Sequence, residues 1–333
     1  MRRRNAVWAA GGAIALAALS IIGLGLGRYG MSPGEALAVL LPGLFSDVEV
    51  TPLMRNVVFN IRLPRILLAM LCGAGLSAAG AAFQGLFANP LATPDTLGVA
   101  TGASFGAALG ILLGWNLAAI QLAALAAGLL AVALVYAVSR ERGGLIMLIL
   151  GGMAVGALFS ALLALVKYVA DPQDVLPAIT YWLMGSLNGA GWSRLALGAP
   201  FIVVGSAVIF ALRWRLNALS LDAQEARALG VNVRRVRVML VLAGAMVTAA
   251  TVSMCGQIGW VGLLVPHAAR LVFGSDNRRV VPASLGFGAV YLLAVDTLAR
   301  VSARGEIPVS ILTAVLGAPA FIALLRRTGG TRA

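Results

Sequence analysis

Residues 117–138 read LAAIQLAALAAGLLAVALVYAV and contain no charged side chain. A helix of about 20 apolar residues is long enough to cross the ~30 Å hydrocarbon core of a bilayer. Similar runs recur along the chain, in which 60% of the residues are apolar and only 11% are charged. A soluble domain carries about 25% charged residues. The sequence therefore predicts an all-α, polytopic membrane protein.

Hydropathy and helix breakers divide the chain into about ten transmembrane helices, which form a single domain, residues 1–333. The run that contains Pro266 is short and gives the weakest of these predictions. Glycines spaced by four, as at Gly98, Gly102 and Gly106, favour close helix packing in lipid. The predicted spans lie near 6–27, 63–87, 97–114, 117–138, 144–166, 195–212, 238–256, 258–273, 281–299 and 307–325.

The positive charges indicate the orientation of these spans. With a cytoplasmic amino terminus, 17 of the 25 lysines and arginines fall in cytoplasmic segments and 8 in outer segments. This excess is the direction that the positive-inside rule requires, and an even number of spans returns the carboxyl terminus to the cytoplasm. The same distribution argues against nucleic acid as the reason for the net charge of +13. We expect a multi-pass membrane protein in contact with lipid.

The sequence offers little for chemistry or for nucleotide binding. A phosphate-binding loop ends in Gly-Lys-Ser/Thr, but the single lysine, Lys167, lies in the context LVKY. One histidine, His267, and two scattered cysteines, Cys72 and Cys255, are too few for a metal site. We therefore predict no catalytic residue, no cofactor and no metal bound by the chain, and expect His267 to make a structural hydrogen bond.

A carrier driven by an ion gradient is the main alternative from another class. Such carriers use carboxylates within the membrane, and only Asp296 lies clearly within a predicted span. Arg300 follows one helical turn later, so pairing of the two side chains is the favoured interpretation. Loss of transport on neutralising Asp296 would support the carrier instead.

The longest predicted cytoplasmic loop, residues 213–237, contains a short helical pattern. Ser220 or Asp222 suits the helix start, Glu225 suits its first turn, and Gly230 suits its end. A helix of two or three turns is unstable alone in water. It therefore rests either on lipid headgroups or, as we favour, in a soluble ATPase subunit.

Several motifs, in order along nearly the whole chain, resemble one family. They are RLPR (62–65), GAAFQGLFANPLA (80–92), PDTLGV (94–99), YWLMGSL (181–187), ALGV (228–231), GWVGLLVPHAAR (259–270), EIPV (306–309) and GAPAF (317–321). In these motifs the chain resembles the permeases of bacterial ABC importers for ferric siderophores, haem and cobalamin. The resemblance implies ten helices in a type II importer fold and a place in the bacterial cytoplasmic (inner) membrane.

The resemblance also implies partners. Two permease subunits, here a homodimer or a pair with a sister permease, surround a central path above two cytoplasmic ATPases, which hold ATP and Mg²⁺. A periplasmic binding protein delivers the cargo. Movement of cargo by alternating access would then be driven from the ATPases.

Roles carried over from the family fall on three groups of residues. Arginines that receive acidic groups of the binding protein match Arg62, Arg65 and Arg300. A cytoplasmic gate matches Asn89, Pro90 and Leu91, and a second gating stretch reads Gly143-Gly144-Leu145-Ile146, which departs from the small polar pattern of some relatives. The coupling helix that seats in the ATPase matches Asp222, Ala223, Glu225, Ala226, Leu229 and Gly230.

The sequence thus predicts a permease subunit for a ferric siderophore or similar iron chelate. Haem and cobalamin are alternative cargoes, because no residue decides between them. An ion-driven secondary transporter is the alternative of another class, and a membrane sensor or scaffold is disfavoured by the lack of a large soluble segment.

Overall fold

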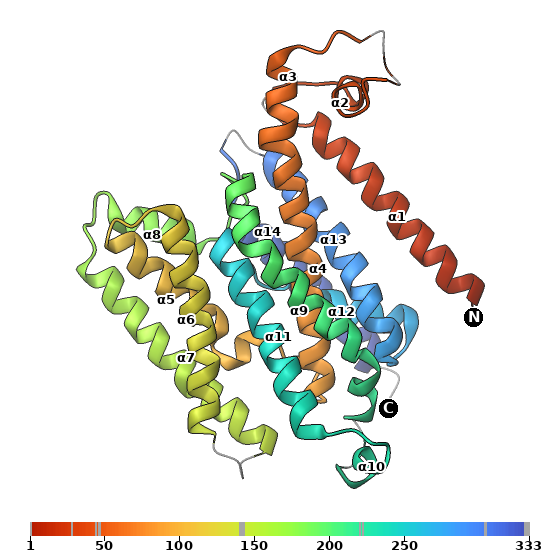
Figure 1. Cartoon of the computed structure of the whole chain (residues 1–333), viewed down its shortest axis with the longest axis vertical. Helices are drawn as coiled ribbons and strands as arrows, with labels where there is room; N and C mark the ends of the chain where they lie inside the picture. Colours follow the sequence, from red (N-terminus) through yellow and green to blue (C-terminus); the bar gives the residue numbers. More distant parts are fainter. Residues whose placement is uncertain are drawn as a thin grey trace.

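The computed structural model describes residues 2–27, 29–43, 45, 48–139, 144–219, 221, 223–302 and 305–329, which form helices and no strand. The helices (Figure 1) are α1 (Arg2–Gly25), α2 (Pro33–Leu40), α3 (Pro52–Asn56), a π-helix (Val57–Arg62), α4 (Leu63–Leu86), the 3₁₀ helix η2 (Pro94–Leu97), α5 (Val99–Leu112), α6 (Leu117–Val138), α7 (Gly144–Val169), α8 (Val175–Leu183), α9 (Trp192–Ala218), α10 (Ala223–Ala228), α11 (Val233–Cys255), α12 (Val261–Phe273), α13 (Asn277–Val301) and α14 (Val309–Gly329).

Ten of these helices match the predicted spans. Six helical segments in the described part are long and apolar enough to cross a bilayer, and four shorter apolar helices, in α1, α5, α12 and α14, complete the set. The start of α1, α10 and the end of α14 lie in the lower half of Figure 1, and α2 and α3 lie at the top. We call the end that carries α10 the inner end and the opposite one the outer end.

Two helices form the centre of the bundle. The protein buries 78% of the most apolar stretch of α11, and the same share of the continuous helical segment Pro52–Leu86, which includes α4. In α7 only 28% of the corresponding stretch is buried. The exposed apolar side chains of α7, such as Leu158 and Leu165, belong on a lipid face.

Glycines allow neighbouring helices to approach closely. Of the glycines spaced by four, Gly102 and Gly106 of α5 confirm the prediction, because a Cβ atom on either would overlap a carbonyl of α6. Glycines outside that spacing do the same between the central helices. A Cβ atom on Gly288 of α13 would overlap the Gly73 carbonyl of α4, and one on Gly80 would overlap the Gly262 carbonyl of α12. Since no hydrophobic effect drives helix association within lipid, contact of this closeness is what holds the bundle together.

The sequence analysis missed three outer elements. The central helix begins at Pro52 rather than near residue 63 and passes through the π-helical turn Val57–Arg62. The helix α2 begins with a capping box, in which the Ser32 hydroxyl accepts from the Glu35 N–H and the Glu35 carboxylate accepts from the Ser32 N–H. The third, α8, follows α7 before the chain turns back. Both α2 and α8 are too short to span a bilayer, and the residues from Pro52 to Arg62 extend a helix that already spans it.

Candidate functional site: an outer ion cluster, a short inner helix and a cavity at membrane depth

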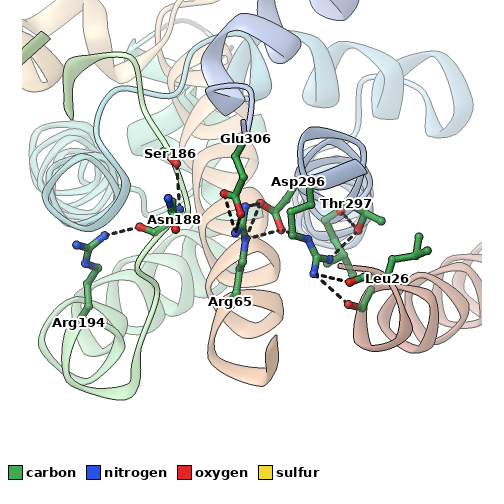
Figure 2. A network of polar contacts seen from close by, with 11 residues as sticks. Leu26, Arg65, Ser186, Asn188, Arg194, Asp296, Thr297 and Glu306 are labelled. Atoms are coloured by element: carbon green, nitrogen blue, oxygen red, sulfur yellow. Dashed lines mark hydrogen bonds and ion pairs between the residues drawn. The ribbon is translucent and has the colours of Figure 1, made fainter. Parts of the chain in front are cut away.

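An ion cluster joins α4, α13 and the loop before α14 at the outer end. We call Arg65, Asp296, Arg300 and Glu306, together with the neighbouring Arg62, the outer ion cluster. Figure 2 shows Arg65 of α4 reaching toward both carboxylates. Its Nε lies 3.0 and 3.1 Å from the two carboxylate oxygens of Asp296, and its Nη1 lies 2.9 and 3.0 Å from those of Glu306. A guanidinium has the planar donor geometry for such paired contacts. The cluster therefore ties α4 to α13 and to the loop before α14.

The other two arginines of the cluster hold the end of α1. Arg300 Nη1 donates to the carbonyls of Gly23 and Leu26 at 3.0 and 3.4 Å, and Arg62 donates to the carbonyls of Leu24, Gly25 and Tyr29. The last carbonyls of a helix have no partner within it, and cations there are favourable. The two arginines thus fasten α1 to the bundle at its outer end.

The predicted pair of Asp296 with Arg300 is confirmed. Arg300 Nε lies 3.4 Å from Asp296 Oδ2 at i,i+4 spacing. Asp296 is fully buried, and its shortest contact is to Arg65, at 2.8 Å. The carboxylate thus lies between two guanidiniums, one on α4 and one on its own helix. This geometry suits a structural ion pair and gives no support to a proton relay.

Burial limits what the outer ion cluster presents to a partner. Arg62 is only 4% exposed and Arg65 only 7%, while the Glu306 side chain is 23% exposed. Three guanidiniums and two carboxylates leave one net positive charge. Docking of a binding protein on these arginines stays a prediction, and it requires that the incoming acidic group compete with Glu306.

The predicted helix in the inner loop is present but shorter than expected. It runs over Ala223–Ala228, and Asp222 lies outside the described residues. Gly230 takes a left-handed φ of +75°, and the Val231 N–H donates to the Ala226 carbonyl at 3.0 Å, which ends the helix. Glycine at this stop was predicted correctly.

The two faces of α10 differ sharply. Ala226 is 1% exposed and packs against the rest of the chain, whereas Leu229 is 60% exposed and Glu225 is also exposed. Leu229 follows a helix that is too short to be stable alone in water, so this segment depends on contacts outside itself. Of the residues predicted for coupling whose burial the structure describes, Glu225, Leu229 and Gly230 are exposed and Ala226 is buried.

The predicted gate residues form an exposed turn after α4. Asn89 Oδ1 accepts from the Leu91 N–H at 2.9 Å, and Ala88 takes a φ of +48°, which makes a tight reversal. Asn89, Pro90 and Leu91 are all exposed. In the second stretch, Gly143 lies outside the described residues, and Ile146 is exposed. Gating by either stretch remains a prediction.

An acidic residue at membrane depth escaped the sequence analysis. Asp95 lies on η2, whose Thr96 and Leu97 pack against Gly152 of α7. Gly152 is eight residues, about 12 Å, from the start of that helix. The predicted spans 63–87 and 97–114 leave Asp95 between them, whereas the close contact of Gly98 with Gly156 of α7 shows that this segment packs tightly against the bundle.

Asp95 lines a small polar cavity of about 30 Å³, room for roughly one water molecule. Thr93, Thr248 and Gln257 share this cavity, and the Thr248 hydroxyl is buried without a hydrogen-bond partner in the described part of the chain. The break between α11 and α12 forms its far wall, where Trp260 takes an unfavourable φ of +70°. Interrupted helices and polar groups at this depth mark the ligand path of many transporters.

His267 has a different role from the predicted one. Its ring packs edge-on against Phe321 of α14, with centroids 5.8 Å apart, and its Nε2 has no hydrogen-bond partner among the described residues. The expected structural hydrogen bond is absent there, because the surrounding α12–α14 interface offers aromatic rather than polar neighbours.

The arrangement defines a class: a polytopic α-helical transport permease, which exposes a short helix at one end and closes an ion cluster at the other. The chain belongs to the FecCD transport family, which matches residues 15–327.

Individual relatives agree. The molybdate import system permease protein MolB of Haemophilus influenzae is 40% identical over 305 residues, covering 91% of this chain and 90% of that protein. The hemin transport system permease protein HmuU of Yersinia pestis is 38% identical over 283 residues, covering 82% and 84%. A solved chain described as an inward-facing metal-chelate type ABC transporter superposes with a TM-score of 0.86 at 39% identity, covering 95% of this chain and 98% of that one. The chain is a transmembrane permease of an ABC importer.

Proposed function

We propose that this permease moves a ferric siderophore or similar iron chelate from the periplasm to the cytoplasm. It works as a homodimer with two ATP-binding subunits at the inner end, and a periplasmic binding protein docks at the outer end. Both termini lie in the cytoplasm. The observation that carries this proposal is the exposed Leu229 beside α10, at the end of the bundle opposite the net-positive outer ion cluster.

The two sides of α10 suit contact with the permease on one side and with the ATPase on the other. Its buried side, at Ala226, transmits movement to the permease, and its exposed side, at Leu229, supplies an apolar contact for a groove in the partner. A helix held only at one side and pushed from the other is a suitable element for switching between outward- and inward-open states.

Asp95, in the polar cavity, bears on which cargo is carried. A carboxylate without an ionic partner in the described residues, beside the hydroxyls and amide of the same cavity, repels a free oxyanion and attracts N–H or O–H donors. Many siderophore complexes and cobalamin carry such donors on a bulky, chelated metal. This favours an iron chelate, with haem and cobalamin as alternatives.

Molybdate is the second candidate, because MolB imports molybdate according to its name and is 40% identical to this chain. The Asp95 carboxylate argues against free molybdate. A molybdenum chelate is compatible with Asp95, because the chelator spreads the negative charge of the complex.

Uptake by a strain that lacks this gene tests the proposal. The strain is given radiolabelled iron as several ferric siderophores, and in parallel haem, cobalamin and molybdate. Loss of one ferric siderophore, restored by the gene and abolished when cellular ATP is depleted, is the expected result. Loss of molybdate uptake alone would transfer the assignment to the second candidate, and uptake that follows an ion gradient instead of ATP would point to a secondary carrier.

A further inference from the structure

An apolar groove separates the inner half of α1 from α12 and α13, away from all of the sites described above. Figure 1 shows α1 leaning away from the bundle toward its amino end, while Arg300 holds its outer end. The resulting α1–α13 groove has a volume of about 490 Å³. Its lining includes three aromatic side chains, two arginines and a glycine: Trp8, Phe273, Phe287, Arg278, Arg279 and Gly286.

The groove has the shape and surface that an acyl chain needs. Trp8, Phe273 and Phe287 form an aromatic cluster with ring centroids 6.1 to 6.4 Å apart. Beside them the wall is smooth, because a Cβ atom on Gly12 or Gly286 would meet nothing within 4 Å. Side chains alone leave this space unfilled, and in a bilayer the neighbouring molecules are lipids.

Positive charge lies at one end of the groove only. Arg278 and Arg279 stand in the first turn of α13, one turn before the groove wall at Pro282. The Asp276 carboxylate accepts from Asn217 and from the Arg278 N–H, and its Oδ2 lies 3.9 Å from the Arg279 Nε. The sequence adds three arginines at residues 2–4, one to two turns before Trp8 on α1.

We infer that the α1–α13 groove binds an anionic phospholipid, with the phosphate at Arg278 and Arg279 and an acyl chain along the aromatic cluster. Guanidiniums just outside the membrane core are suited to phosphate, and each adds to the affinity for anionic headgroups. The lipid would fill the wedge beside α1 and hold its inner half against the bundle. This inference depends on the chain being a membrane protein, and not on its cargo or its ATPase.

Native mass spectrometry of the delipidated protein tests the inference, with cardiolipin, phosphatidylglycerol or phosphatidylcholine added back. We expect R278Q/R279Q to weaken cardiolipin and phosphatidylglycerol binding about ten-fold or more. The matched control R213Q/R215Q removes the same charge from the inner end of α9 and should leave the binding unchanged. The variant Gly286→Leu should also weaken it, since its side chain enters open space in the groove.

Two results would overturn the inference. One is equal binding of anionic lipid by the wild type, R278Q/R279Q and Gly286→Leu. The other is binding of phosphatidylcholine as tight as that of phosphatidylglycerol, which would show a groove that holds acyl chains without recognising the phosphate.

Discussion

At the scale of single residues, Asp296 holds the outer ion cluster together. It is the buried carboxylate between Arg65 and Arg300, and its loss would leave both guanidiniums with less compensation at the edge of the membrane. Removing one partner of a buried ion pair costs more than the pair itself contributes, because the remaining charge stays buried.

Asp296→Asn should therefore lower the free energy of unfolding by about 3 to 5 kcal/mol. The measurement is thermal or denaturant unfolding of the purified protein in detergent. Glu306→Gln is the control, with a smaller effect, since Glu306 is partly exposed to water. An Asp296→Asn protein of unchanged stability that no longer transports would instead support a proton-carrying role.

Glu306 also allows a test of docking. Because it occupies Arg65 Nη1, an acidic group of a binding protein must displace it. Glu306→Gln should leave the cluster more positive and raise the association rate and affinity for the binding protein several-fold, most clearly at low salt. Glu306→Asp is the matched control and should change little. Unaltered binding kinetics in both variants would remove the outer ion cluster from the docking surface.

At the scale of elements, contact between glycines sets how closely α4 and α13 pack. Gly288 faces the Gly73 carbonyl and the Ser77 side chain, whereas Gly286, two residues earlier on the same helix, faces open space. Replacing each of these two glycines with alanine therefore separates the effect of packing from that of helix propensity. Both changes place alanine in a helix interior, where it is normally favoured over glycine.

Gly288→Ala should destabilise the protein by about 1 to 3 kcal/mol through overpacking. Gly286→Ala should be neutral or slightly stabilising. Unfolding of both variants in the same detergent measures the difference. Equal stability of the two would show that α4 and α13 are not in the close contact described.

The helix α10 gives a second prediction at this scale. Leu229→Glu should place a charge in the proposed ATPase contact and reduce co-purification of the ATPase at least ten-fold, while the permease still folds because Leu229 is exposed. Leu229→Met keeps the apolar contact and should behave like the wild type. Full co-purification of the ATPase with Leu229→Glu would favour the interpretation of α10 as a helix resting on lipid headgroups.

At the scale of the whole molecule, the single chain leaves the cavity that Asp95 lines at its surface. Asp95 is exposed beside that cavity in the isolated chain, and an ionisable residue at membrane depth is costly where it meets lipid. A second permease chain would place it in an enclosed aqueous path. Two differently tagged copies of the chain should therefore co-purify in detergent. Recovery of only one tag would point to a sister permease as the second subunit.

The amino-acid sequence by itself determined the class of fold, the ten spans, the family and the stop of α10 at Gly230. These depend on local properties: the length of apolar runs, the spacing of glycines and the conformational freedom of one residue. The tertiary structure alone decided that Arg65 is neutralised by Asp296 and Glu306, 231 and 241 residues later in the chain, and that Asp95 lies at membrane depth. Such contacts join residues far apart along the chain, and the energy of a buried charge depends on which groups the fold brings within a few ångströms of it.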